Sequence, residues 1–197
     1  MKSIDGQYED LYIINKSKFY SFAYPVTTEE EIKEILSGLR ERFADATHIC
    51  FAYSLSNPRL EKADDNGEPS GTAGKPLLEL IKKKNMENVL VVSVRYFGGI
   101  KLGAGGLVRA YTNSGNLVLD KAQIVDLVLE KKYRLEIDVS QGARVQETLR
   151  NLGAEVVSCV YTDKLSLEFI GEHRDKLMQI YPTAKIDLLG EKLICRK

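Results

Sequence analysis

Chemically useful side chains are densest between Ala63 and Pro76. This segment joins three glycines and a helix start to acidic, hydroxyl and basic residues, namely Asp64, Asp65, Glu68, Ser70, Thr72 and Lys75. Carboxylates at this density can hold Mg²⁺ or act as a general base, and glycine-rich helix starts attract anions. The spacing is not that of a nucleotide-binding P-loop, because Pro69 and Pro76 stand where that motif needs Gly and Ser or Thr. Two roles therefore stay open for the polar side chains of this segment. They could support a metal or a polar ligand, or they could cap turns.

A second segment, from Arg95 to Tyr111, places a glycine loop between a buried strand and a helix. It is not a dinucleotide-binding fingerprint, because Val108 replaces the third glycine. Backbone N–H groups at a helix start still form an anion cradle when basic side chains lie nearby. For Phe97 and Tyr111 we favour a core position over base stacking. Across the two segments, the predicted ligands for RNA or phosphate are Lys75, Arg95, Gly98, Gly99, Lys101, Gly103, Gly105, Gly106 and Arg109.

Residue types and spacing assign no catalytic residue. His48 opens a strand near these loops, where it would give either polar support or a structural hydrogen bond. Cys50 has no evident base partner, so nucleophilic catalysis by its thiol is not favoured. Cys50, Cys159 and Cys195 form no metal-binding pattern. We expect no metal site and no cofactor, although an enzyme built on the same loops would use Mg²⁺.

Composition excludes several classes of protein. The 197 residues include 28 basic and 28 acidic side chains, so the formal net charge is zero and no basic arm would coat nucleic acid. The hydrophobic fraction of 44% is enough for a real core. No apolar run approaches the roughly 20 residues needed to cross a bilayer, and the N-terminus does not read as a signal peptide. Together with the scattered cysteines, this predicts a cytoplasmic protein without a membrane contact.

The elements that must position the motifs are mixed α and β. Strands are expected at 11–14, 19–24, 48–53 and 88–94, and helices from Thr27 and over 76–84 and 105–120. Thr27 or Thr28, followed by glutamates, is typical of a capping box.

A new pattern follows a charged joint near residue 130. Strands are expected at 133–139, 155–161, 164–170 and 184–189, with helices at 141–151 and 172–181. This β-α-β-β-α-β order is typical of the split βαβ sandwich. The sequence therefore predicts an α+β chain with two domains, residues 1–129 carrying both motifs and residues 130–197.

Both motifs also resemble those of a known family. The uninterrupted stretches Asp64–Pro76 and Val94–Tyr111, together with His48–Tyr53 and Lys16–Phe19, are similar to the YigZ/IMPACT family over roughly residues 1–125. The sequence resembles the bacterial members, without the RWD domain of the eukaryotic ones.

The resemblance implies a specific architecture. The first domain would have the left-handed βαβ fold of domain IV of elongation factor G, also found in a ribosomal small-subunit protein and in GHMP-type kinases. The second would be ferredoxin-like and similar to domain V of elongation factor G. Eukaryotic relatives of this family regulate translation.

These observations lead to one principal hypothesis and two alternatives. The principal one is a binding protein, rather than an enzyme, that is linked to translation and contacts RNA or the ribosome through the glycine-rich basic face of the first domain. A nucleotide- or phosphometabolite-binding protein, or a Mg²⁺-dependent enzyme, could use the same loops. A protein partner docked on the motif face is the other alternative. The sequence leaves the oligomeric state open.

Overall fold

The computed structural model describes residues 1–196 and contains two compact units, Met1–Asp126 and Leu127–Arg196. Each unit has its own sheet and its own hydrophobic core. Within the described chain, no helix combines the length and apolar character needed to cross a membrane.

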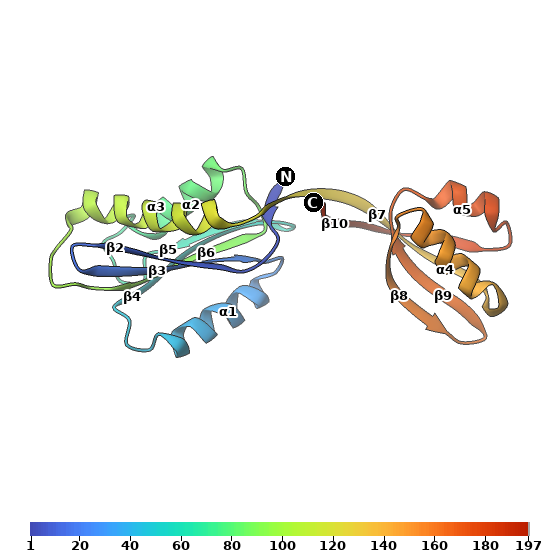
Figure 1. Ribbon diagram of the computed structural model, residues 1–197, viewed down its shortest axis with the longest axis horizontal. Coiled ribbons are helices and arrows are strands. Elements are labelled where there is room, and N and C mark those ends of the chain that lie inside the picture. Colours follow the sequence, from blue (N-terminus) through green and yellow to red (C-terminus); the bar gives the residue numbers. More distant parts are fainter. Residues whose placement is uncertain (197) are drawn as a thin grey trace. The chain divides into compact units, whose positions relative to one another are not determined.

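A five-stranded antiparallel sheet forms the centre of the first unit (Figure 1), with the strand order β2-β3-β6-β4-β5. Its strands are β2 (Tyr8–Ile14), β3 (Ser17–Pro25), β4 (His48–Ser56), β5 (Arg59–Asp64) and β6 (Val89–Tyr96). The central strand β6 is buried along almost its whole length, which agrees with its apolar sequence.

Helices cover both faces of this sheet. Helix α1 (Glu29–Arg42) lies on one face, and α2 (Gly74–Lys83) and α3 (Gly103–Lys121) lie on the other (Figure 1). Alternation along β6 explains this layering, because Val92 packs into the cluster with α1 and Val91 into the cluster with α2 and α3. The capping box predicted for α1 is confirmed: the Thr28 side chain accepts from the Glu31 backbone N–H, and the Glu31 side chain reaches back.

The second unit has the element order predicted from the sequence, β-α-β-β-α-β. Its sheet has the strand order β1-β7-β9-β8, with β10 also paired to β7, and the first strand of that order comes from the start of the chain. Tyr133, Leu135 and Ile137 of β7 face a core shared with the two helices. The elements are β7 (Ile124–Asp138), a 3₁₀ turn (Val139–Gln141), α4 (Gly142–Asn151), β8 (Glu155–Tyr161), β9 (Lys164–Ile170), α5 (Arg174–Ile180) and β10 (Lys185–Arg196).

Three strand assignments differ from the prediction. The charged joint expected near residue 130 is instead the middle of β7, because buried Val125 and Leu127 already alternate with exposed residues there. The predicted boundary after residue 129 therefore falls inside this strand. Strand β5 was missed because its sequence RLEKAD is charged and mostly exposed. The short β1 (Lys2–Ile4), which pairs with the start of β7, was also missed.

Candidate functional site

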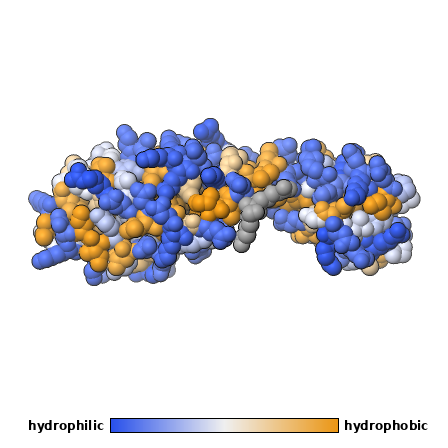
Figure 2. Space-filling model, turned by 45° about the horizontal axis from the view of Figure 1, so that its top comes forward, coloured by the Kyte–Doolittle hydropathy of each residue, from blue (hydrophilic) through white to orange (hydrophobic). Residues whose placement is uncertain are grey.

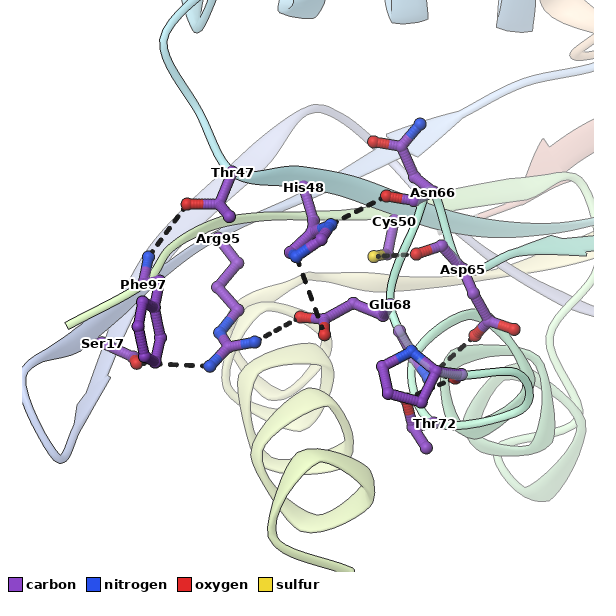
Figure 3. Close-up of polar contacts among 12 residues, drawn as sticks. Ser17, Thr47, His48, Cys50, Asp65, Asn66, Glu68, Thr72, Arg95 and Phe97 are labelled. Atoms are coloured by element: carbon purple, nitrogen blue, oxygen red, sulfur yellow. Dashed lines mark hydrogen bonds and ion pairs between the residues drawn. The ribbon is translucent and has the colours of Figure 1, made fainter. Parts of the chain in front are cut away.

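The two motif segments meet through a buried ion pair between Glu68 and Arg95 (Figure 3). Glu68 lies in the loop between β5 and α2, and Arg95 lies near the end of β6. Only 3% of the Glu68 side chain and 6% of the Arg95 side chain are exposed. The pair thus holds the first motif loop against the central strand.

Arg95 was expected to contact phosphate, and the structure corrects this. Its guanidinium lies 5.4 Å from the ring centre of Phe19 and 5.5 Å from that of Phe97, and Nη2 lies 3.5 Å from the Ser17 hydroxyl (Figure 3). Within residues 1–196 its Nε has no hydrogen-bond partner. An arginine enclosed in this way neutralises the internal carboxylate and is not free to bind an external anion.

Tyr111 and Cys50 extend this network into the core. The Tyr111 hydroxyl donates to Glu68 over 2.8 Å, and the Cys50 sulfur lies 3.3 Å from the same hydroxyl. Burial first, and then the neighbouring Cys50 and Glu68, raise the pKa of Tyr111, so the phenol stays a donor. Burial also raises the pKa of Cys50 to about 12, which makes this thiol a poor nucleophile.

His48 borders the network at the start of β4. Its Nδ1 lies 2.9 Å from the Asn66 carbonyl oxygen, which can only accept, so Nδ1 carries a proton. Its Nε2 lies 3.8 Å from the Glu68 carboxylate. His48 therefore holds the turn at Asn66 against the sheet by a hydrogen bond. Of the two roles predicted for His48, this is the structural one.

Asp65 caps helix α2 from outside the helix. Its carboxylate accepts hydrogen bonds from the backbone N–H groups of Gly71, Ala73 and Gly74 over 2.7–2.9 Å. Burial alone would raise the pKa of Asp65, but these three donors outweigh it and lower the pKa. Asp65 thus performs the capping that Ala73, at the N-cap position, cannot.

The other polar residues of this loop mostly form turns. Asp64 accepts from the Asn66 N–H over 2.8 Å, and the Thr72 hydroxyl donates to the Pro69 carbonyl over 2.6 Å. Ser70 is exposed. Among the described residues no group of three or more His, Cys, Asp or Glu side chains is arranged to hold a metal ion. The carboxylates suggested for Mg²⁺ support are committed to bonds within the protein.

The part of the second motif that faces solvent is the loop between β6 and α3 and the first turns of α3. Lys101 and Arg109 are exposed there, and neither forms an ion pair within residues 1–196. Phe97 is 46% exposed, so the core position favoured for it is wrong, whereas Tyr111 is fully buried as expected. We call Phe97, Lys101 and Arg109, with the glycines between them, the exposed motif face.

Its glycines serve different purposes. A Cβ on Gly98 would overlap the backbone of Lys16 and Ser17, so this glycine allows the loop to pack against the β2–β3 turn. Gly99 and Gly103 have positive φ angles of 83° and 68° and form turns. Gly106 is partly enclosed by Leu102, but Gly105 is exposed, and a Cβ on it would meet only the end of the Arg109 side chain at 3.7 Å.

Lys75 is exposed and lines a groove between α2 and α3. The α3 side of this groove, which was not predicted from the sequence, consists of Val108, Thr112, Asn116 and Asp120. Their spacing of four residues on a predicted helix was the signal available for it.

Comparison with known proteins identifies relatives of the chain. Residues 15–119 match the family model described as the Impact N-terminal domain. IMPACT family member YvyE of Bacillus subtilis (strain 168) is 36% identical over 164 residues, which cover 83% of this chain and 76% of YvyE. YigZ of Escherichia coli (strain K12) is 30% identical over 151 residues, covering 75% and 74%. Human Protein IMPACT is 33% identical over 112 residues, covering 54% of this chain and 34% of the human protein.

Two solved structures were also compared with the chain. A crystal structure described as that of a hypothetical protein aligns over 96% of both chains, with a TM-score of 0.70 and 25% identity. A structure of the two-domain translational regulator Yih1 aligns over 61% of this chain and 47% of its own, with a TM-score of 0.37 and 26% identity. The family model covers more than half of the chain and the bacterial relatives most of it. The chain belongs to the IMPACT family, together with YigZ and YvyE.

Proposed function

We propose that this protein is a cytoplasmic, translation-linked binding protein that contacts RNA or the ribosome through the exposed motif face. One observation carries the proposal: Lys101 and Arg109 are exposed without an acidic partner within residues 1–196, in the same segment of chain as the exposed ring of Phe97. Unpaired cations bind phosphates, and an exposed aromatic ring stacks on an unpaired base.

The backbone around these side chains supports the same ligand. Helix α3 begins without a side-chain cap, so its first backbone N–H groups can donate hydrogen bonds to an anion. Open space at Gly105 allows a phosphate to approach the helix start closely. A zero net charge means that any affinity for RNA depends on this local face rather than on the whole surface.

Membership of the IMPACT family supports the link to translation, because the eukaryotic members regulate translation. The proposed architecture points the same way: a left-handed βαβ domain followed by a ferredoxin-like domain resembles domains IV and V of elongation factor G. A similar fold supports a function only by analogy, so the experiment must change residues of the exposed motif face directly.

The alternative function, a Mg²⁺-dependent enzyme that uses the same loops, is less well supported than the binding protein. It needs free carboxylates, whereas Asp65 is bonded to three backbone N–H groups and Glu68 to Arg95 and Tyr111.

The decisive experiment compares the wild type with Lys101→Glu/Arg109→Glu in cosedimentation with ribosomes and in binding to a single-stranded RNA oligonucleotide, across a salt series. We expect salt-sensitive binding by the wild type. Losing two phosphate contacts should reduce the slope of log K against log salt by about 1.4 for single-stranded RNA, with at least a tenfold loss of affinity at low salt.

Lys33→Glu/Arg40→Glu is the matched control, because it makes the same charge change on α1, which covers the opposite face of the sheet. Equal losses in both double variants would mean that only overall charge matters. Absence of wild-type binding at low salt, or capture by ribosomes that survives nuclease removal of exposed RNA, would overturn RNA contact and favour a protein partner.

A further inference from the structure

Helices α2 and α3 border a groove of about 800 Å³ on the first unit. Its walls are two stripes of residues spaced four apart, so each helix presents one side along its length. The stripe on α2 and the preceding loop comprises Gly71, Lys75, Pro76, Glu79, Leu80, Lys83 and Lys84, and the stripe on α3 comprises Val108, Thr112, Asn116 and Asp120. A volume of this size is typical of a small-molecule site between helices.

The groove has a defined apolar floor. Pro76 and Leu80 are buried, and Gly115 lets the two helices approach closely, because a Cβ there would lie 2.8 Å from a Leu77 methyl group and 2.9 Å from one of Leu80. Figure 2 shows that the surface of the first unit mixes hydrophilic and hydrophobic residues. An apolar floor with a few convergent polar groups is the usual composition of a ligand site.

Some charged side chains of the groove form an ion pair and others do not. Lys84 bonds to Asp120 over 2.6 Å, and this ion pair joins the two helices at the end of the groove where α2 finishes. Lys75 and Lys83 are exposed lysines of α2 without an ion pair in the described chain. They are eight positions apart, which corresponds to about 12 Å along the helix axis. Between them the walls carry Glu79, Thr112 and Asn116.

We propose that this groove binds an elongated small molecule with an anionic group at each end and hydrogen-bonding groups in its middle. One anion meets Lys75 and the other meets Lys83, while Thr112 and Asn116 bond the middle and the apolar chain lies on Pro76 and Leu80. A continuous strand of nucleic acid fits less well, because its phosphates would pass the Glu79 and Asp120 carboxylates. The site goes beyond the proposed function, since Lys101 and Arg109 do not line it.

The test uses alkanediol bisphosphates of increasing chain length, each paired with the monophosphate of the same length. Binding to the full chain is followed through backbone amide shifts in NMR titrations. We expect saturable binding at about millimolar concentration, shifts on α2 and α3, and tightest binding at the length that spans the two lysines. The matching monophosphate should bind about two- to fivefold more weakly, as expected for the loss of one exposed ion pair.

Lys75→Met and Lys83→Met should each abolish the preference for the two-ended ligand, and the fold should survive because both side chains are exposed. Lys33→Met on α1 is the matched control and should bind like the wild type. The proposal is overturned by the absence of saturable binding, by shifts located away from α2 and α3, or by variants that leave the length preference unchanged. A competition experiment separates this site from RNA binding. If single-stranded RNA displaces the bisphosphate, and still does so in Lys101→Glu/Arg109→Glu, the groove binds RNA instead.

Discussion

Two regions built from the same pair of motifs have opposite physical character. The internal network of Glu68, Arg95 and Tyr111 is buried, and its two opposite charges pair with each other, whereas the exposed motif face keeps Lys101 and Arg109 in solvent without ion-pair partners in the described residues. Arg95 and Arg109 show the contrast most clearly, since one stabilises a carboxylate and the other is free to meet a ligand. A basic residue that lies near a glycine loop in the sequence is therefore not necessarily a ligand-binding residue.

The largest effect should follow from breaking the internal ion pair. Glu68→Gln leaves the buried Arg95 charge without its counter-ion and should lower the free energy of unfolding of the first unit by about 3–5 kcal/mol, measured by urea denaturation. Glu61→Gln is the matched control: its bond to Lys82 is partly exposed, so its loss should cost at most about 1 kcal/mol. Similar losses in both variants would show that the buried pair does not stabilise the unit. Adding Arg95→Met to Glu68→Gln should recover part of the loss.

The exposed face should behave in the opposite way. Phe97→Ala should weaken binding of single-stranded RNA by about 1–3 kcal/mol through the loss of stacking, while the urea midpoint changes little, since the ring is 46% exposed. Ile100→Ala removes a side chain of similar exposure, 44%, that has no aromatic ring. If Ile100→Ala weakens RNA binding as much as Phe97→Ala, the contact is hydrophobic and does not involve stacking.

Asp65 gives an effect of intermediate size with a defined pH dependence. Asp65→Ala should cost about 1–2 kcal/mol near pH 7, because the backbone N–H groups of Ala73 and Gly74 at the start of α2, and that of Gly71 in the preceding loop, lose their acceptor. The lowered pKa of Asp65 in the folded protein means that its contribution is complete above the unfolded value of about 3.9 and is lost as the pH falls through the folded value.

Urea denaturation of both proteins at about pH 7 and about pH 3 measures this dependence. The difference between wild type and Asp65→Ala should be smaller at the lower pH. A difference that grows on acidification would contradict the capping role.

The smallest effect separates two glycines of the same motif. Gly105→Ala should raise stability by about 0.5–1 kcal/mol, because Gly105 lies in α3 without a positive φ angle and with open space around it. The added methyl group should also weaken RNA binding if phosphate approaches the helix start. Gly98→Ala is the contrasting variant and should destabilise the protein, since its Cβ would overlap the Lys16 backbone. Thermal unfolding measures both variants. If their unfolding midpoints shift in the same direction from that of the wild type, this distinction is wrong.

Local patterns predicted most of the elements. The capping residues and apolar spacing of α1, the apolar run of β6 and the alternation in β7 each depend on neighbours a few positions away, and the structure has all three elements. The charged strand β5 lacked such a pattern and was missed. In the site, the exposure of Lys101 and Arg109 agreed with the prediction, but the burial of Arg95 and the exposure of Phe97 did not.

The sequence alone therefore determined where most of the helices and strands form, how the second unit orders its elements and which loops carry charge and glycine. Only the tertiary structure decided which of those charges are enclosed. Arg95 is buried because Glu68, 27 positions away, and Ser17, 78 positions away, are brought to it by the pairing of β6 with β3 and by the loop after β5. The groove between α2 and α3 likewise exists only because two helices that follow different strands pack on the same face of one sheet. Periodicity along the chain predicts which face of a helix or strand is buried, but it does not specify which distant segment packs against that face, and the enclosure of Arg95 and the shape of the groove depend on that packing.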